Sequence, residues 1–492
     1  MRITLSKTPP KQNKAIAFFV FSDRPLVHHL RGLTPAIRTA VARAAKAFEA
    51  HEGKHVIPLP NKSIETVLLF GLGKRSRVTQ KKFERAIRSA VRLSAQQKNY
   101  QLTLILPEWE SRERSIFLAA YNALVASYAF TRYQSKPKPR MKSIAIVTPV
   151  ITTDAKRALQ RALIIGEETN NARDLSNTPG ADLTPVLLAE HAQRDGKRAG
   201  YAVTILDEKK METLGMGGIL GVSKGSAEGA KMIICEYAHP DHRKDKPVVY
   251  VGKGVTFDTG GLNLKPDMSM LEMHMDMTGG SSVMHAIAAI ARLKLPVRAI
   301  GIIPSVENMP GSAGYRPGDV LRTYGGKTIE VKNTDAEGRI ILADALSYAK
   351  TFQPAVIIDL ATLTGAALVA LGQRMAAVLS PDRSLAQELI RCGETSGEQL
   401  WELPLTEEWK KDLDSEVADI ANIGKHRYGG TIIGAAFLWP FAPIQRWAHI
   451  DIAPVMLAID EDHLAHGSKG FGTHLLITYA EQYAQAKQGR AS

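Results

Sequence analysis

The sequence predicts an α/β protein with a small N-terminal α/β domain and a larger C-terminal α/β domain, whose central sheet is mixed and largely parallel. Its 492 residues exceed what one hydrophobic core holds, so roughly two to three domains are expected. Apolar runs of strand length alternate with runs of helical spacing along the chain. Several apolar runs end in polar or glycine-rich loops, which is typical of parallel strands in open α/β sheets.

The first domain is predicted over residues 1–165. Its predicted strands are residues 14–22, Thr66–Phe70, Leu102–Leu106 and Ser143–Val147, and its predicted helices are Pro35–Ala50, Lys81–Leu93 and Ser115–Phe130. A long helical run at residues 154–175 follows, and we expect this helix to bridge the two domains. The second domain is then predicted over residues 166–492.

Composition excludes several classes of protein. With 45% hydrophobic residues the chain is expected to fold, and its two distant cysteines, Cys235 and Cys392, argue against a disulfide scaffold or a cysteine-ligated zinc site. No apolar run approaches the roughly 18 residues of a membrane span. The first residues, Met1–Lys7, lack the apolar core of a signal peptide. We therefore expect a soluble, cytoplasmic protein with no membrane partner.

The charge of the chain is uneven. Residues 1–165 hold 30 Lys+Arg against 9 Asp+Glu, whereas the rest of the chain is mildly acidic, although the whole carries +14. Basic residues recur near helical spacing at Lys74, Arg75, Arg77, Lys81, Lys82, Arg85, Arg88 and Arg92. Such a cationic stripe suits a polyanion such as nucleic acid, and equally suits a solvated charged surface. Both interpretations stay open.

The second domain shows a series of predicted strands. They are Val203–Leu206, Met232–Glu236, Pro247–Val251, Arg298–Ile303, Ile329–Val331 and Ala355–Asp359. Four of them lead into polar or glycine-rich loops, namely Gly252–Gly261, Glu307–Pro310, Asn333–Arg339 and Leu360–Gly365. Because parallel strands place their carboxyl ends together, we expect these loops to converge at one edge of a sheet.

The loop Asn333–Arg339 is the densest in charge. On an extended strand end, Asp335 and Glu337 would share a face, and no basic residue lies between them. A cation would then be needed close by. The alternative is a solvated turn whose acidic residues favour the start of the helix predicted from Arg339.

Two further acids complete a candidate site. Asp258 follows a predicted strand, and Asp276 stands alone in the apolar segment Met273–Met277, where burial of an unpaired carboxylate is costly. With Asp335 and Glu337, four carboxylates in one pocket need a counter-charge of about +4, which two divalent cations supply. Oxygen ligands suit Mg, Mn or Zn, and such a pair activates water and polarises a carbonyl or phosphoryl oxygen. The residues predict metal-assisted hydrolysis, and a two-metal phosphoesterase is one of the enzyme classes that fit them.

Three segments resemble the signatures of the leucyl (cytosol) aminopeptidase family, the two-metal M17-type aminopeptidases. These are Val251–Pro266, Asp359–Ala366 and the complete heptapeptide Asn333–Arg339, supported by Asn171–Leu175, Glu307–Met309, Arg316–Asp319 and Gly430–Ile432. The resemblance covers most of residues 166–492. It implies a metallo-aminopeptidase that hydrolyses N-terminal residues, leucine and other apolar residues foremost, from peptides. Family members form hexamers of two trimers, so a homo-hexamer is expected.

The resemblance also implies roles for single residues. It assigns one divalent metal ion, Mn or Zn, to Lys253, Asp258, Asp276 and Glu337, and a second to Asp258, Asp335 and Glu337. In the implied mechanism a metal-bridging hydroxide attacks the scissile carbonyl. Lys265 stabilises the oxyanion, and Arg339 holds a bicarbonate that acts as general base. The residues implied to line the substrate pocket are Met273, Asn333, Thr362, Leu363 and Gly365.

The sequence departs from the family pattern at three places. His274 stands where many members have lysine, Thr278–Ser281 replaces a Gly-Ala-Ala type of sequence, and Pro454 stands where glycine is usual. These positions touch or back the pocket wall, so the preferred N-terminal residue stays open. Some bacterial members combine peptidase activity with DNA binding, which makes an accessory nucleic-acid role of residues 1–165 the second alternative.

Overall fold

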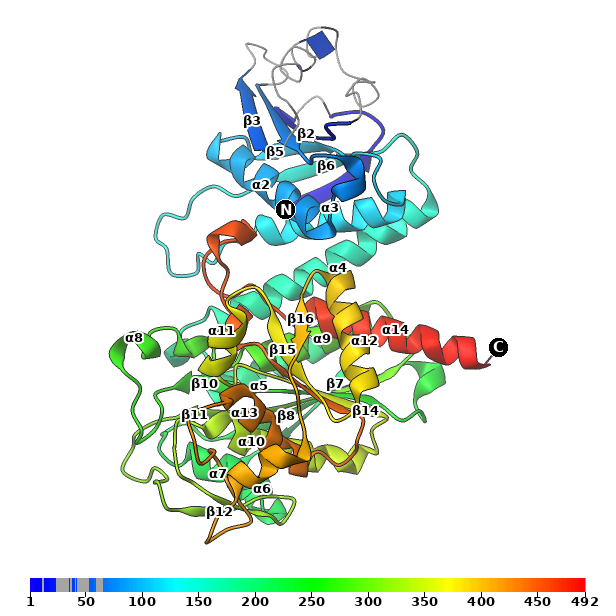
Figure 1. Cartoon of the computed structure of the whole chain (residues 1–492). Helices are drawn as coiled ribbons and strands as arrows, with labels where there is room; N and C mark the ends of the chain where they lie inside the picture. Colours follow the sequence, from blue (N-terminus) through cyan, green and yellow to red (C-terminus); the bar gives the residue numbers. More distant parts are fainter. Residues whose placement is uncertain are drawn as a thin grey trace. The chain divides into compact units, whose positions relative to one another are not determined.

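The computed structural model describes residues 1–10, 13–23, 35, 38, 39, 41, 53–58 and 65–491 (Figure 1). The helix predicted at Pro35–Ala50 falls almost wholly outside these residues. The chain divides into two compact units: Met1–Glu167 with Ala458–His466, and Glu168–Leu457 with Gly467–Ser492. The division predicted at residues 165 and 166 remains a proposal. The long helix α4, Thr153–Ser176, contains the boundary between the units.

The first unit is built on a sheet of six strands among the described residues. Its order is β1 (Arg2–Ser6), β6 (Ser143–Val147), β5 (Gln101–Ile105), β2 (Ala15–Val20), β4 (Thr66–Gly71) and β3 (Gly53–Pro58). All neighbours are parallel except β3, which runs antiparallel to β4. Every residue of β2 and β4 is buried, as the continuous apolar runs predict for strands covered on both faces.

Two described helices accompany this sheet, α2 (Gln80–Gln96) and α3 (Arg112–Ala126). Helix α2 begins where the Thr79 side chain accepts a hydrogen bond from the Lys82 amide, and it buries Phe83, Ile87 and Val91 along one face. The arginines of α2 are half-buried rather than freely exposed.

The segment Ala458–His466 belongs to the first unit although it lies close to the end of the chain. Arg88 Nη1 donates a hydrogen bond to the Asp462 carbonyl at 3.4 Å, and Arg92 Nη1 donates to the Leu464 carbonyl at 2.6 Å. Arg88 also pairs with Glu84, at 3.7 Å. Part of the predicted cationic stripe therefore holds this segment in place.

The second unit contains a mixed, largely parallel sheet of nine strands, in agreement with the predicted fold class. Its order is β16 (Leu400–Glu402), β15 (Ala376–Leu379), β18 (Trp447–Asp451), β14 (Val356–Ala361), β9 (Val248–Gly252), β11 (Arg298–Asn308), β8 (Lys231–Ala238) and β7 (Ala202–Leu206), with β10 (Gly254–Asp258) paired to β11. Only the β11–β8, β7–β8 and β15–β18 pairs are antiparallel.

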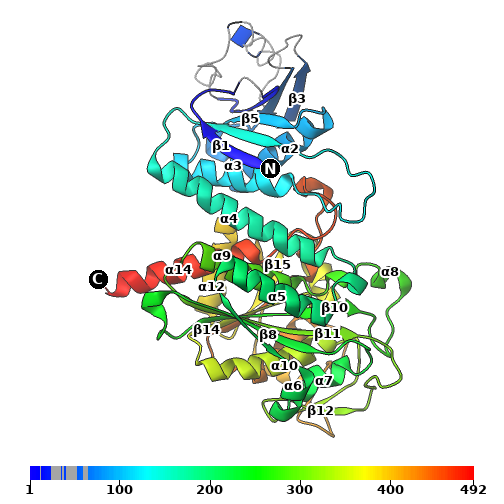
Figure 2. The same ribbon diagram turned by 180° about the vertical axis from the view of Figure 1, so that it is seen from behind.

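Helices cover both faces of this sheet (Figures 1 and 2). Helices α5 (Pro185–Ala199), α9 (Thr278–Arg292) and α14 (Thr473–Ala491) lie on one face, whereas α7 (Gly217–Ser223), α10 (Glu337–Ala349) and α13 (Gly430–Leu438) lie on the other. The remaining helices are α6 (Glu208–Leu214), α8 (Asp267–Met270), α11 (Gly365–Leu371) and α12 (Arg383–Ser396). One core cluster of the unit joins α7, α10 and α13 to residues of β9 and β11 such as Val249, Val251 and Ile300. No helix of the described residues is long and apolar enough to cross a membrane.

Two expectations about the loops were wrong. Part of the segment Gly252–Gly261, expected as a loop, forms strand β10, which pairs with the far end of the long strand β11. The strand before Asn333 does not belong to the main sheet. It is β13 (Thr328–Glu330), which forms a small separate sheet with β12 (Val320–Arg322) and β17 (Ile420–Ala421). The partners of so short a strand are set by distant segments, which a local pattern does not contain.

Candidate active site

Five residues predicted as metal ligands come from four places in the second unit. Lys253 links β9 to β10, and Asp258 ends β10. Asp276 ends the single turn Met273–Met275 before α9, whereas Asp335 precedes α10 and Glu337 is its first residue. Asp335 and Glu337 therefore lie in a turn and a helix start, not on the strand end that we expected.

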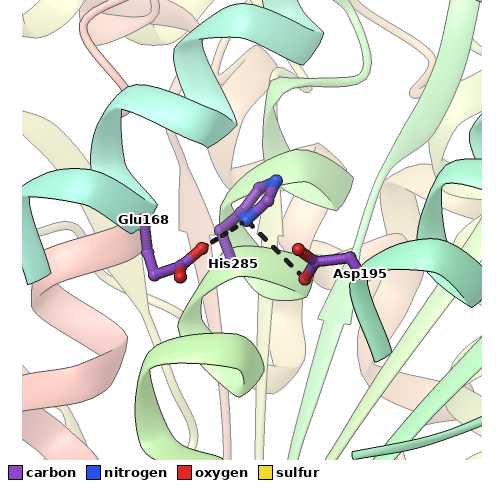
Figure 3. Close-up of side chains that lie close together, drawn as sticks. All are labelled: Glu168, Asp195 and His285. Carbon is purple, nitrogen blue, oxygen red and sulfur yellow. Dashed lines mark hydrogen bonds and ion pairs between the residues drawn. The ribbon is translucent and has the colours of Figure 1, made fainter. Parts of the chain in front are cut away.

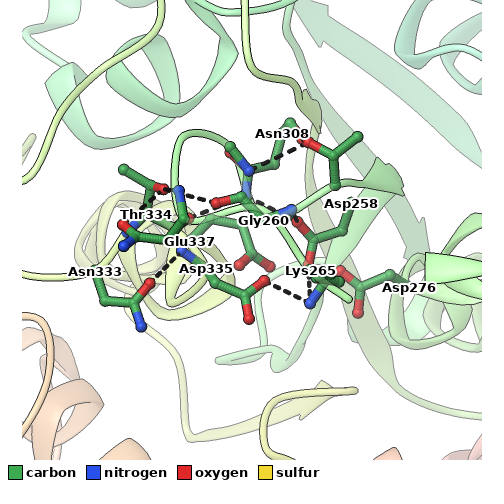
Figure 4. A network of polar contacts seen from close by, with 12 residues as sticks. Asp258, Gly260, Lys265, Asp276, Asn308, Asn333, Thr334, Asp335 and Glu337 are labelled. Atoms are coloured by element: carbon green, nitrogen blue, oxygen red, sulfur yellow. Dashed lines mark hydrogen bonds and ion pairs between the residues drawn. The ribbon is translucent and has the colours of Figure 1, made fainter. Parts of the chain in front are cut away.

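The structure brings the four carboxylates together (Figure 4). One carboxylate oxygen from each of Asp258, Asp335 and Glu337 lies within 4.8 Å of the others. Asp276 joins them through Lys253, whose Nζ lies 2.8 Å from Asp276 Oδ2 and 2.7 Å from Glu337 Oε1. The sequence segments that supply the acids are thus neighbours in space.

Lys253 is almost fully buried, and its Nζ has three neighbouring acceptors. Besides the two carboxylates, it donates a hydrogen bond to the Thr362 carbonyl at 3.0 Å. Burial by itself lowers the pKa of Lys253, but the carboxylates of Asp276 and Glu337 outweigh it and raise this pKa well above its usual range. In this arrangement the ammonium is a counter-ion of the acids.

Lys265 pairs with the other side of the carboxylate group. Its Nζ lies 2.8 Å from Asp258 Oδ2 and 2.5 Å from Asp335 Oδ1. Its pKa is also raised, because the attraction of the carboxylates, Asp258 foremost, exceeds the effect of burial. Lys265 therefore forms salt bridges with the acids. These salt bridges could be its structural role, as an alternative to a catalytic one.

The carboxylates carry more negative charge than the two lysines balance. Burial raises the pKa of Asp258, Asp276 and Asp335, and neighbouring carboxylates raise each further. Four carboxylates against two ammonium groups leave a deficit of two positive charges when all are ionised. Hard oxygen donors at this spacing in a buried pocket fit divalent cations. The carboxylates of this site are therefore suited to bind divalent cations.

A hydrogen-bond framework fixes the orientation of Asp258. Its Oδ1 accepts from the Gly260 amide and from Asn308 Nδ2, both at 2.8 Å. Asn308 Nδ2 also donates to the Thr334 carbonyl at 3.0 Å, which ties the β10 loop to the loop of Asp335. Gly260 has a φ of +87°, and a Cβ there would meet Asn263 O at 2.4 Å, so the turn requires glycine.

Sequence reasoning assigned no role to several residues of this framework. The Tyr315 hydroxyl donates to the Thr334 carbonyl at 2.6 Å, and Asn422 Nδ2 donates to the Asn333 carbonyl at 2.6 Å. Asn422 is separated from Asn333 by 89 residues of sequence and follows the very short strand β17, so no local signal identifies it. Of these residues only Asn308 could be identified from the sequence, because it lies in the segment Glu307–Met309 that resembles the family.

Arg339 is buried and does not pair with the acids. Its Nη1 donates to the Asn422 carbonyl at 2.9 Å, while its buried Nε has no hydrogen-bond partner among the described residues. Burial lowers the pKa of Arg339 to about 10, although Glu337 and Asp451 partly oppose this. The guanidinium is still charged at neutral pH, and an anion would satisfy its remaining donor.

The predicted pocket residues divide into two groups. Thr362 is buried, and its hydroxyl donates to Asp276 Oδ1 at 2.7 Å, so it supports the acids directly. The Leu363 amide donates to Asp451 Oδ1 at 3.1 Å, which anchors the same loop from behind. Met273, Asn333 and Leu363 are half-buried, and Gly365 is exposed at the start of α11.

A second buried polar cluster lies elsewhere in this unit (Figure 3). Glu168, Asp195 and His285 lie close enough to hold a metal ion, but His285 Nδ1 already bonds Glu168, and both Asp195 oxygens accept hydrogen bonds, from Arg198 and Tyr201. Glu168 accepts from His285 Nδ1 at 2.9 Å, from Arg198 at 2.8 Å and from Arg292 at 2.5 Å. Two arginines balance two carboxylates, so the cluster joins α4, α5 and α9 without needing a cation.

Comparison with known proteins decides the family. The model of the catalytic domain of the cytosol aminopeptidase family matches residues 170–477, and that of the family's N-terminal domain matches residues 34–137. The chain belongs to the cytosol aminopeptidase family. It is therefore an aminopeptidase and a peptide hydrolase, as the sequence predicted, and the family implies divalent metal ions and peptide substrates.

Relatives match over most of the chain. A probable cytosol aminopeptidase of Syntrophotalea carbinolica is 40% identical and covers 94% of this chain and 96% of its own. A probable cytosol aminopeptidase of Nitrosospira multiformis is 42% identical, with 91% and 89% covered. Among solved structures, the bottromycin maturation enzyme BotP in complex with Mn has a TM-score of 0.84 and 32% identity, with 96% of this chain and 100% of BotP covered.

Proposed function

We propose that this aminopeptidase uses two divalent metal ions, Mn or Zn, to remove N-terminal leucine and other apolar residues from peptides. The observation that carries the proposal is the buried carboxylate group with its excess of negative charge. The Mn complex of BotP, a structural relative, supports the choice of metal. When bound, the pair of ions supplies a bridging hydroxide as nucleophile and polarises the scissile carbonyl.

We propose that the five predicted ligands would hold the two ions, with Asp258 and Glu337 shared between them as the family resemblance implies. Asp335 completes one ligand set, and Lys253 with Asp276 completes the other. Lys253 must lose its proton to serve as a ligand, and the charge of two adjacent dications favours that loss.

Two cations of the chain would assist the reaction. Lys265 Nζ lies beside Asp258 and Asp335, where a developing oxyanion would find an ammonium donor. Arg339 keeps one buried N–H for an anion, which supports its proposed role as the holder of bicarbonate, the general base. If Met273 and Leu363 line the substrate pocket as predicted, their side chains would give it an apolar part, which would favour apolar N-terminal residues.

The test is release of leucine from a leucyl-anilide by the full-length protein loaded with Mn or Zn. We expect Glu337→Ala and chelation of the metal each to abolish release. The matched control is Glu330→Ala, which removes a carboxylate on β13 whose partners are Ser415 and Lys332 and which lies outside the cluster. Activity on a phosphate ester, with metal bound and no leucine released, would instead establish the two-metal phosphoesterase.

Three wider properties remain proposals. A homo-hexamer follows from family resemblance and is tested by sedimentation of the purified chain. A cytoplasmic location is tested by cell fractionation. Nucleic-acid binding by residues 1–165 rests on their basic charge, although Arg88 and Arg92 already bond carbonyls of Ala458–His466. Salt-dependent retention of DNA by the full-length chain would support it.

A further inference from the structure

The first unit has an open cleft of about 790 Å³, within the range of small-molecule sites. It is lined by the carboxyl-terminal ends of α2 and α3, by the chain from Ala126 to Met141, and by Ala465 and His466. All of these residues belong to one compact unit. The cleft is remote in sequence from every residue of the proposed metal site.

The lining of the cleft is strongly cationic. Arg92, Lys98, Lys138 and Arg140 line it, and none of its described lining residues is acidic. Lys98, Lys138 and Arg140 are exposed and Arg92 is half-buried. Ala465 and His466, which form one wall, follow His463, and basic side chains surround His463. Burial lowers the pKa of His463, and the charges of Lys54, Arg92, Arg85 and Arg88 lower it further.

The two helix ends offer a competing explanation for these cations. Each carboxyl terminus carries roughly half a negative charge, which basic side chains stabilise. Two such ends account for about one unit of negative charge, whereas the four basic side chains carry four positive charges. About three positive charges therefore remain unbalanced in the lining. This excess favours a ligand that carries more than one negative charge.

Part of the remaining lining is apolar or aromatic. Tyr100, Tyr128 and Phe130 contribute rings, and Val91 and Met141 contribute apolar surface. Inorganic phosphate would use the cations but not this surface. Phosphate pairs well with arginine and lysine, while flat heterocycles stack on aromatic rings. We propose that this cleft binds a nucleoside phosphate, with the phosphate beside Lys138 and Arg140 and the base against the aromatic side chains.

The experiment is calorimetric titration of the full-length protein with AMP, adenosine, ribose 5-phosphate, inorganic phosphate and a short single-stranded oligonucleotide. We expect AMP to bind about tenfold or more tightly than each of adenosine, ribose 5-phosphate and inorganic phosphate, because only AMP uses both parts of the cleft. The double variant Lys138→Glu, Arg140→Glu should weaken AMP binding about tenfold or more. Aminopeptidase activity should be unchanged in this variant.

The control is Lys136→Glu, which reverses one of the positive charges on the same exposed segment at a residue that does not line the cleft. It should change AMP affinity by no more than about threefold, the scale of long-range screening. Equal binding of AMP and inorganic phosphate, equal effects of control and double variant, or binding of the oligonucleotide without AMP would each overturn the proposal.

Discussion

Replacing Gly338 by alanine should separate activity from stability. Gly338 lies in the first turn of α10, between Glu337 and Arg339. A Cβ at this position would lie 2.5 Å from Lys253 Cε and 2.7 Å from its Nζ. Carbon contacts are normally about 3.5–4.0 Å, so the end of Lys253 must move by about 1 Å. Asp276, Glu337 and the Thr362 carbonyl hold that end in place.

If Lys253 is a metal ligand as proposed, such a displacement should lower catalysis by about 100-fold, whereas alanine in a helix gains up to about 1 kcal/mol over glycine. We therefore expect kcat/KM on a leucyl-anilide to fall by about two orders of magnitude, while the free energy of unfolding measured in urea stays within about 1 kcal/mol of the wild type. The control is Gly424→Ala, whose Cβ would meet nothing closer than 3.4 Å. A Gly338→Ala enzyme with kcat/KM close to that of the wild type would refute the role of Lys253 in the site.

Two further predictions concern the second unit. Burial and the charge of His285 lower the pKa of His191 from 6.5 to about 4, so the unfolded chain takes up this proton first as the pH falls. This contribution to the free energy of unfolding is fully present above about pH 6.5, and about 2 kcal/mol of it should be lost by pH 5. Urea unfolding of the His191→Gln variant should not show this loss. Equal pH dependence in the wild type and the variant would contradict the assignment. Asp451 accepts hydrogen bonds from the Leu363 amide and the Thr364 hydroxyl. Asp451→Ala should therefore release the loop that supports Lys253 and lower kcat/KM by about 10- to 100-fold. Asp451→Asn should lower kcat/KM less in the same kinetic assay.

Much of the fold is readable from local patterns. The continuous apolar runs that became β2, β4, β9 and β14 are visible in sequence because both faces of each strand are buried. Strand β10 escapes such a pattern, because Gly254, Thr256 and Asp258 interrupt its apolar residues. Its pairing depends on the unusual length of β11, which reaches Asn308 beyond the other parallel strands.

The site was less accessible to local reasoning than the strands. Carboxylates near loop glycines identified the candidates, and the complete heptapeptide Asn333–Arg339 identified the family. Their roles as ligands and catalysts stay predictions. The framework of Asn308, Tyr315 and Asn422 depends on contacts between distant segments, so spacing along the chain carries no signal for it. The sheet membership of β13 was wrong for the same reason.

The membership of Ala458–His466 in the first unit bears on the order in which the protein is made. Domains generally fold as they leave the ribosome, the N-terminal one first. Here Arg88 and Arg92 can form their hydrogen bonds to the carbonyls of Asp462 and Leu464 only after these two residues, near the end of the chain, have been synthesised. The first unit can therefore assume its final form only after nearly all of the second has emerged. A fragment ending at residue 165 would lack the wall of the cleft that Ala465 and His466 form.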